Sequence, residues 1–287
     1  MTLKRSALFM PANNLRAILK AKTLACDAII LDLEDSIAPD KKVQARHSAK
    51  KEITEKGFAP RELAIRVNGL GTPWHKEDLA AFVSNSLNAL VIPKAESPEE
   101  IRLLGDYMNQ IGYPEQVRLW LMAETPLGVL NINALCQAHP RISTIFMGTS
   151  DLAKCLRVRQ TPNRDGLVQA LSTCVLAARA ANLDILDGVC LDFTDSKLFK
   201  SQCVQGKTLG FDGKTLIHPS QIEICNQVFA PTEEDVARSQ EIVLAFREAE
   251  LKGEGLCVLN GTLIENLHLE EAKQILKLAE TIQARLL

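Results

Sequence analysis

Eight short aliphatic runs alternate with helix-forming stretches along most of this chain, and this alternation limits its possible folds more than any other feature. The runs fall at residues 6–11, 28–33, 62–67, 89–92, 117–123, 142–147, 184–189 and 215–217. Strands that alternate with helices form parallel sheets, and eight such units are the number that closes a barrel. We therefore predict an α/β fold, a (β/α)8 TIM barrel with a short C-terminal extension of helices and a hairpin.

The alternation stops after Pro231. The sequence predicts a long helix over Thr232–Lys252, a hairpin that turns at Asn260-Gly261, and a closing helix over 267–287. We predict a catalytic barrel domain at residues 1–230 and an extension at 231–287. The extension is too short to bury a core alone, so we expect it to pack on the barrel or on a neighbouring subunit.

Composition narrows the class of protein. The formal net charge is −2, which gives no electrostatic reason to expect nucleic acid or a membrane surface as a partner. No apolar run approaches the length of a membrane span. The eight cysteines are scattered and form no C-x-x-C pair, which indicates reduced thiols rather than a structural zinc site. We predict a cytoplasmic protein.

Polar side chains follow the aliphatic runs at the point where each predicted strand ends. In a parallel barrel these carboxyl ends share one face, which carries the active site. An acidic cluster follows the second run, and further polar residues follow later ones: Asp32, Glu34, Asp35, Arg66, Lys94, Glu124, Asp151 and His218. Such a cluster needs a cation or hydrogen-bond donors, because close carboxylates raise each other's pKa.

Glu124 and Asp151 close consecutive strands, so their carboxylates can converge. Two carboxylates with room for water and ligand oxygens suit Mg2+. Arg66 could stabilise negative charge on a substrate oxygen. The residues Asp32, Glu34, Asp35 and Lys94 would surround these groups and orient them. Simpler readings stay open: a strand-end acid is often a helix cap or salt bridge, Arg66 could be a structural partner of Asp32, Lys94 a surface lysine and His218 a core histidine.

Several motifs occur together, in one order, from about residue 4 to 232. They include the run Leu31–Ser36, Arg66-Val67-Asn68, Pro93-Lys94, Glu124-Thr125, Gly148 with Asp151-Leu152, and a stretch from Gly210 to Gln221. As a set they resemble the citrate lyase beta-subunit family of the HpcH/HpaI aldolase superfamily, which includes malyl-CoA and citramalyl-CoA lyases.

The resemblance implies a Mg2+-dependent barrel, a homotrimer or hexamer, that cleaves or forms a carbon–carbon bond in a 3-hydroxy-carboxyacyl thioester. Its partners would be an acyl-CoA or acyl-carrier thioester and a 2-oxo acid. The family's metal ligands match Glu124 and Asp151, and its substrate-carbonyl arginine matches Arg66. The resemblance places coenzyme A at five positions: Phe9, Arg16, Lys20, Ile217 and His218.

The tail departs from the family pattern. Members that condense or hydrolyse thioesters carry an aspartate after a Gly-x-Met-Ile turn, whereas here Gly261-Thr262-Leu263-Ile264 precedes Glu265. Glu265 is the candidate acid/base, with one extra methylene. The leading hypothesis is a lyase for a citramalyl, malyl or citryl thioester. A malyl-CoA-type thioesterase is the alternative within enzymes, and a non-catalytic keto-acid- or thioester-binding subunit is the alternative outside them.

Overall fold

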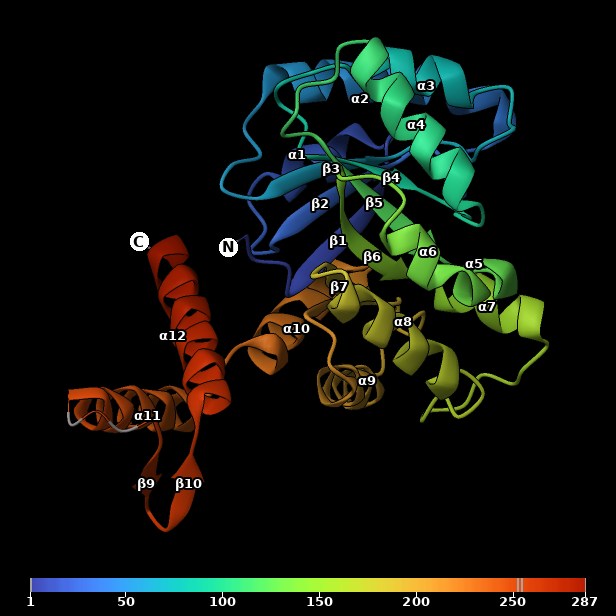
Figure 1. Cartoon of the computed structure of the whole chain (residues 1–287). Helices are drawn as coiled ribbons and strands as arrows, with labels where there is room; N and C mark the ends of the chain where they lie inside the picture. The colour runs from blue at the N-terminus through green and yellow to red at the C-terminus, as the bar shows by residue number, and fades with distance from the viewer. Residues whose placement is uncertain (1, 252, 254, 287) are drawn as a thin grey trace. The chain divides into compact units, whose positions relative to one another are not determined.

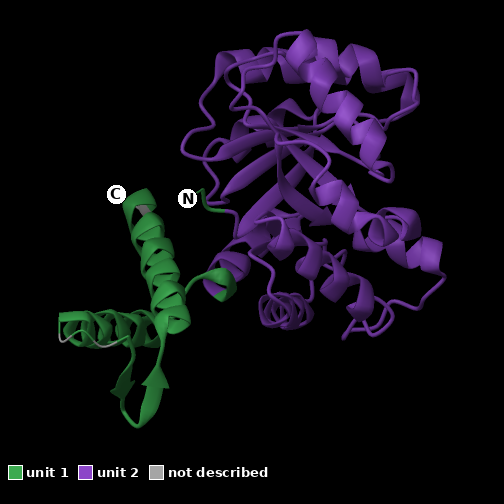
Figure 2. Ribbon diagram, in the orientation of Figure 1, with its two compact units in different colours: residues 1–3, 228–287 green, residues 4–227 purple. Residues whose placement is uncertain are grey.

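The computed structural model describes residues 2–251, 253 and 255–286, and it divides into two compact units (Figure 2). One unit comprises residues 4–227, and the other comprises the described residues of 1–3 and 228–287. Each unit has its own buried apolar cluster.

The first unit is a closed barrel of eight parallel strands, which confirms the predicted fold class (Figure 1). Each strand pairs with the next along the chain, and β8 pairs with β1 to close the ring. The strands are β1 (Ser6–Pro11), β2 (Ala28–Asp32), β3 (Glu62–Arg66), β4 (Ala89–Ile92), β5 (Arg118–Ala123), β6 (Ile142–Met147), β7 (Asp184–Asp187) and β8 (Gly213–Leu216).

Strand alternation decides which side chains reach the active face. Successive residues of a strand point to opposite sides, so every second residue points into the barrel. Ala64 on β3 belongs to the inner cluster, and Arg66 two residues later therefore points the same way. Trp120 and Met122 on β5 belong to that cluster too, which carries Glu124 inward just past the strand end.

Helices surround the strands (Figure 1). They are α1 (Leu15–Ala21), α2 (Lys42–Glu55), α3 (His75–Ala81), α4 (Pro98–Gln110), α5 (Pro126–Leu130), α6 (Ile132–Cys136), α7 (Thr149–Leu156), α8 (Val168–Ala180), α9 (Ser196–Leu209) and α10 (Ile222–Phe229), with short 3-10 turns at Pro39–Lys41 and Pro219–Gln221. Asn14 and Ser97 cap α1 and α4, because each side-chain oxygen accepts an orphan backbone N–H. In the part of the chain that the structure describes, every helix is too short or too polar to cross a membrane.

An ion cluster fills the barrel interior where the strands begin. The Lys4 ammonium lies 2.7 Å from Asp184 and 3.4 Å from Glu62, and 5.6 Å from the centre of the Trp120 ring. Burial raises the pKa of Glu62, although the Lys4 charge opposes this effect. Trp120 and Phe146 pack above with ring centres 5.3 Å apart. This end of the barrel is therefore occupied by side chains.

The structure differs from the prediction at the ends of two strands and in the segments that follow β5 and β6. The strand predicted at 184–189 ends at Asp187, and the one predicted at 215–217 begins at Gly213. The sequence analysis did not anticipate α5, α6 and α7, which follow β5 and β6. These helices have five to eight residues, too few for an amphipathic period to stand out.

The second unit contains α11 (Glu233–Leu251), a hairpin of β9 (Cys257–Leu259) and β10 (Thr262–Ile264), and α12 (Asn266–Leu286). A capping box precedes α11: the Asp235 side chain accepts the backbone N–H of Thr232, and the Thr232 hydroxyl accepts that of Asp235. The hairpin turns at Asn260-Gly261 as predicted. Lys252, the predicted helix end, lies outside the described residues. Where the extension packs stays a prediction.

Candidate functional site

A cavity of about 440 Å³ opens at the carboxyl ends of the strands. It is lined by side chains and backbone from β1, β2, β3, β5, β6, β7 and β8 or the segments that follow them. Seven of the predicted site residues border it: Phe9, Asp32, Asp35, Arg66, Glu124, Asp151 and Ile217. None of its lining residues is a histidine or a cysteine.

Arg66 is the most firmly held side chain in the site. Its guanidinium donates to both oxygens of Asp32, at 2.6 and 2.8 Å, and its carbon lies 5.0 Å from the centre of the Phe9 ring. Burial disfavours the charged form, but Asp32 outweighs it, so the pKa of Arg66 is raised. Asp32 uses two of the five N–H donors of the guanidinium, which leaves others for a ligand. Arg66 is therefore a structural partner of Asp32, and this pairing leaves room for a ligand as well.

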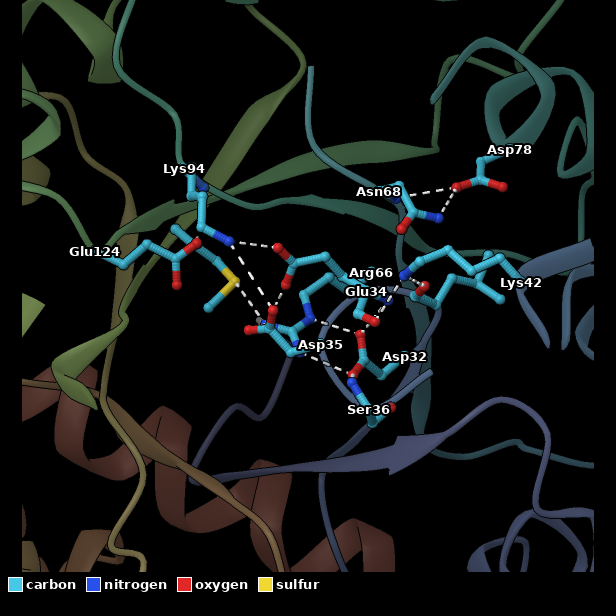
Figure 3. Close-up of polar contacts among 12 residues, drawn as sticks. Asp32, Glu34, Asp35, Ser36, Lys42, Arg66, Asn68, Asp78, Lys94 and Glu124 are labelled. Carbon is cyan, nitrogen blue, oxygen red and sulfur yellow. Dashed lines mark hydrogen bonds and ion pairs between the residues drawn. The ribbon is translucent and has the colours of Figure 1, made fainter. Parts of the chain in front are cut away.

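The acidic run turns around Asp32. Its oxygens also accept the backbone N–H groups of Glu34 and Ser36, at 2.9 and 3.1 Å (Figure 3). Glu34 accepts the Lys94 ammonium at 2.5 Å, and its other oxygen lies 3.1 Å from Arg66 as an ion pair without a hydrogen bond. Glu34 and Lys94 border a neighbouring cavity of about 640 Å³ rather than the first one.

Glu124 is buried, and burial raises its pKa to about 7. One of its oxygens accepts the backbone N–H of Lys94 at 2.7 Å. Lys94 has a left-handed backbone, with φ of 49°, which an L-residue adopts at some cost. This turn, directly after β4, aims the amide at Glu124 while the side chain reaches Glu34. A buried carboxylate with one oxygen bound and a raised pKa is a group suited to accept a cation.

Asp151 lies in the first turn of α7, which begins at Thr149 directly after β6. Its side chain is about one third exposed and lies 4.0 Å from the Lys94 ammonium. Within the described residues, no three His, Cys, Asp or Glu side chains gather closely enough to hold a metal by themselves. A metal here would need oxygens from water or ligand beside Glu124 and Asp151.

Gly148 provides the space that Glu124 occupies. A Cβ at this position would overlap the Cβ and one carboxylate oxygen of Glu124. We expect Gly148→Ala to displace the carboxylate and weaken Mg2+ binding by about 10–100-fold, as for other changes that disturb a ligand's support. Isothermal titration with Mg2+ measures this. Gly255→Ala is the matched control, since its Cβ would meet nothing within 4 Å. Equal Mg2+ affinity in the two variants would contradict the expectation.

The residues predicted to hold coenzyme A are only partly gathered. Phe9 and Ile217 line the cavity. His218 lies beside it, exposed rather than in the core, with its ring stacked on Phe193 at 4.7 Å between centres. Arg16 and Lys20 lie on the exposed face of α1 and do not line the cavity. Glu265 belongs to the other compact unit, exposed between β10 and α12.

The sequence analysis missed a buried ion cluster next to the site. Asp187 accepts Arg164 at 2.6 Å and Lys214 at 2.7 Å, and all three are buried. Asp187 is a strand-end acid, a signal that could have drawn attention to it. However, Leu186 points into the barrel, so the next residue, Asp187, points outward to the helix layer, where Gly206 of α9 lies close.

Comparisons with known proteins identify the family of the chain. A profile of the HpcH/HpaI aldolase/citrate lyase family matches residues 5–219. The chain is 42% identical to a (3S)-malyl-CoA thioesterase of Cereibacter sphaeroides, over 98% of this chain and 96% of the relative. It is 31% identical to citrate lyase subunit beta of Leuconostoc mesenteroides, over 96% and 93%. A crystal structure of CitE from Mycobacterium tuberculosis with magnesium, acetoacetate and coenzyme A matches with a TM-score of 0.76 and 26% identity, over 96% and 97%.

Proposed function

Because the chain belongs to the HpcH/HpaI aldolase/citrate lyase family, we propose that it is a Mg2+-dependent hydrolase of a malyl-type coenzyme A thioester. The observation that carries this choice is the 42% identity with the Cereibacter thioesterase, which extends over 98% of the chain. This identity favours the thioesterase, which the sequence analysis gave as the alternative, over the lyase, which it gave as the leading hypothesis. The relatives with lyase names among those compared are more distant.

The donor set fits Mg2+. Glu124 and Asp151 offer oxygen ligands, which Mg2+ prefers, and they would hold the ion together with water and substrate oxygens. When bound, Mg2+ would supply Lewis-acid polarisation of substrate oxygens. The CitE structure contains magnesium.

Arg66 would bind the thioester carbonyl oxygen. Arg66 lines the cavity, its Nη1 also contacts the Met122 sulfur at 3.8 Å, and Asp32 fixes the guanidinium before any ligand arrives. Donors that are already oriented stabilise the charge that develops on the oxygen during attack by water. Phe9 and Ile217 would line the path of the thioester, with His218 at the mouth and Arg16 and Lys20 as exposed cations for phosphates.

A carbon–carbon lyase is the second candidate, supported by the 31% identity with citrate lyase subunit beta. The same metal ligands and Arg66 would then stabilise an enolate-like product, with Glu265 as acid/base toward the acetyl carbon. A non-catalytic binding subunit, the choice between coenzyme A and a carrier protein, and a homotrimer or hexamer all stay predictions.

The products decide between the candidates. We expect purified protein with Mg2+ and malyl-CoA to release free coenzyme A and malate, and EDTA to abolish release. Citramalyl-CoA and citryl-CoA complete the panel, with products resolved by mass. Acetyl-CoA with a 2-oxo acid would instead establish the lyase. Binding without turnover of any thioester would favour the non-catalytic subunit.

A further inference from the structure

The turn after β2 holds Asp35 in a fixed place. Asp32 accepts the backbone N–H groups on either side of Asp35, those of Glu34 and Ser36, and Glu34 accepts the N–H of Ile37 at 3.1 Å. The backbone of residue 35 is therefore anchored on both sides by a carboxylate that is itself bound to Arg66. The position from which the Asp35 side chain projects is thus set before substrate binds.

The neighbouring carboxylates are already engaged. Asp32 is bound to Arg66 and to the turn, Glu34 to Lys94, and Glu124 to the backbone N–H of Lys94. Asp35 differs from all three (Figure 3). Within the described residues, no donor forms a hydrogen bond to its carboxylate, and its cations lie farther away, Arg66 at 3.7 Å and Lys94 at 4.0 Å. These separations are too long for direct hydrogen bonds, so the Asp35 oxygens keep lone pairs for a water molecule.

Asp35 also has the right exposure. Its side chain is 59% exposed, and it borders both the cavity of about 440 Å³ and the neighbouring one of about 640 Å³. Lys94 and Glu34 border only the neighbouring cavity. A water on Asp35 would therefore have access from solvent and would lie next to the guanidinium that we assign to the thioester oxygen.

We propose that Asp35 is the general base that activates the hydrolytic water, an assignment that rests on the proposed thioesterase function. Asp35 takes a proton from water as the water oxygen bonds to the thioester carbon. The carbonyl electron pair moves to the oxygen held by Arg66 and returns as the C–S bond breaks. The sulfur leaves with its electron pair and takes up a proton, and the products are a carboxylic acid and a thiol. The base thus comes from the barrel itself, and Glu265 is not needed for hydrolysis.

The test measures release of free thiol from malyl-CoA by the full chain with saturating Mg2+. We expect Asp35→Asn to lower kcat by about 10²–10⁴-fold with little change in KM, the range for loss of a general base. Asp35→Glu should retain part of the rate, and formate should partly restore Asp35→Ala. A merely structural role would not give rescue by formate. The control is Asp40→Asn in the same connection, whose side chain is 75% exposed.

Isothermal titration with Mg2+ alone gives a second readout, and we expect equal affinity in wild type and Asp35→Asn. Three outcomes overturn the assignment. Full hydrolysis by Asp35→Asn leaves the thioesterase intact but removes the base. Loss of hydrolysis in Glu265→Gln but not in Asp35→Asn places the base on the second unit. A wild type that hydrolyses no thioester of the panel overturns the proposed function and this assignment with it.

Discussion

Glu124→Gln should abolish Mg2+-dependent turnover and still leave the barrel folded. The amide keeps an oxygen for the Lys94 N–H but removes the charge that would bind the ion. We expect Mg2+ affinity to fall by at least about 10²-fold, more than for a change outside the ligands. Titration with Mg2+ and product release from malyl-CoA measure the effect.

Stability should change in the opposite direction. Burial raises the pKa of Glu124 from 4.5 to about 7 in the metal-free protein. A carboxyl group whose pKa is raised on folding favours the folded state fully at a pH below its pKa in the unfolded chain. This contribution is lost as the pH rises through its folded pKa of about 7. At pH 8 in EDTA, wild type should therefore be less stable than Glu124→Gln, by on the order of 2–3 kcal/mol. At pH 4 the two should be nearly equal.

Glu99→Gln is the control for both measurements, because Glu99 is exposed at the start of α4. Urea denaturation followed by tryptophan fluorescence reports on the barrel, since Trp74 and Trp120 both lie in that unit. Mg2+ titration of Glu124→Gln that matches wild type would remove Glu124 from the metal site.

Asp187→Asn should be the most destabilising single change near the site. It leaves Arg164 and Lys214 buried without their counter-charge. Breaking a buried ion pair in this way costs about 3–5 kcal/mol. Urea denaturation measures the loss. Replacing all three members with apolar residues of similar volume should recover part of it, because no charge then stays buried.

The pH dependence follows from the same cluster. Burial opposes ionisation of Asp187, but Lys214 and Arg164 outweigh it, so its pKa is lowered below 3.8. A carboxyl group whose pKa is lowered on folding contributes stability at a pH above its pKa in the unfolded chain. That stability is lost as the pH falls through its pKa in the folded protein. Asp106→Asn, whose pair with Arg102 is exposed, should cost at most about 1 kcal/mol. A similar small cost for Asp187→Asn would contradict a structural role for the cluster.

The fold was largely predictable because its signal is repeated eight times. Each strand is a short aliphatic run, and each helix start such as Ser97-Pro98 carries its own cap chemistry. The positions of Asp32, Arg66 and Glu124 at one cavity followed from barrel topology, since strand ends share a face. Their catalytic roles stay proposals.

Other features were not predictable because they depend on direction rather than spacing. Asp187 ends a strand as Glu124 follows one, yet it points outward, and a one-residue difference in register decides this. The left-handed Lys94 and the glycine at 148 reflect a close approach in space that no local pattern reveals. That Arg66 and Lys94 form their hydrogen bonds with Asp32 and Glu34 rather than with Asp35 likewise depends on residues far apart in the sequence.

The ion cluster of Lys4, Glu62 and Asp184 affects how ligands reach the cavity. It fills the interior where the strands begin, and the cavity opens at the opposite face. We expect substrate to enter and products to leave through this opening. If the proposed thioester is the substrate, its long arm would lie across this opening with the smaller acid beneath it, and we expect the carrier thiol to leave before the acid.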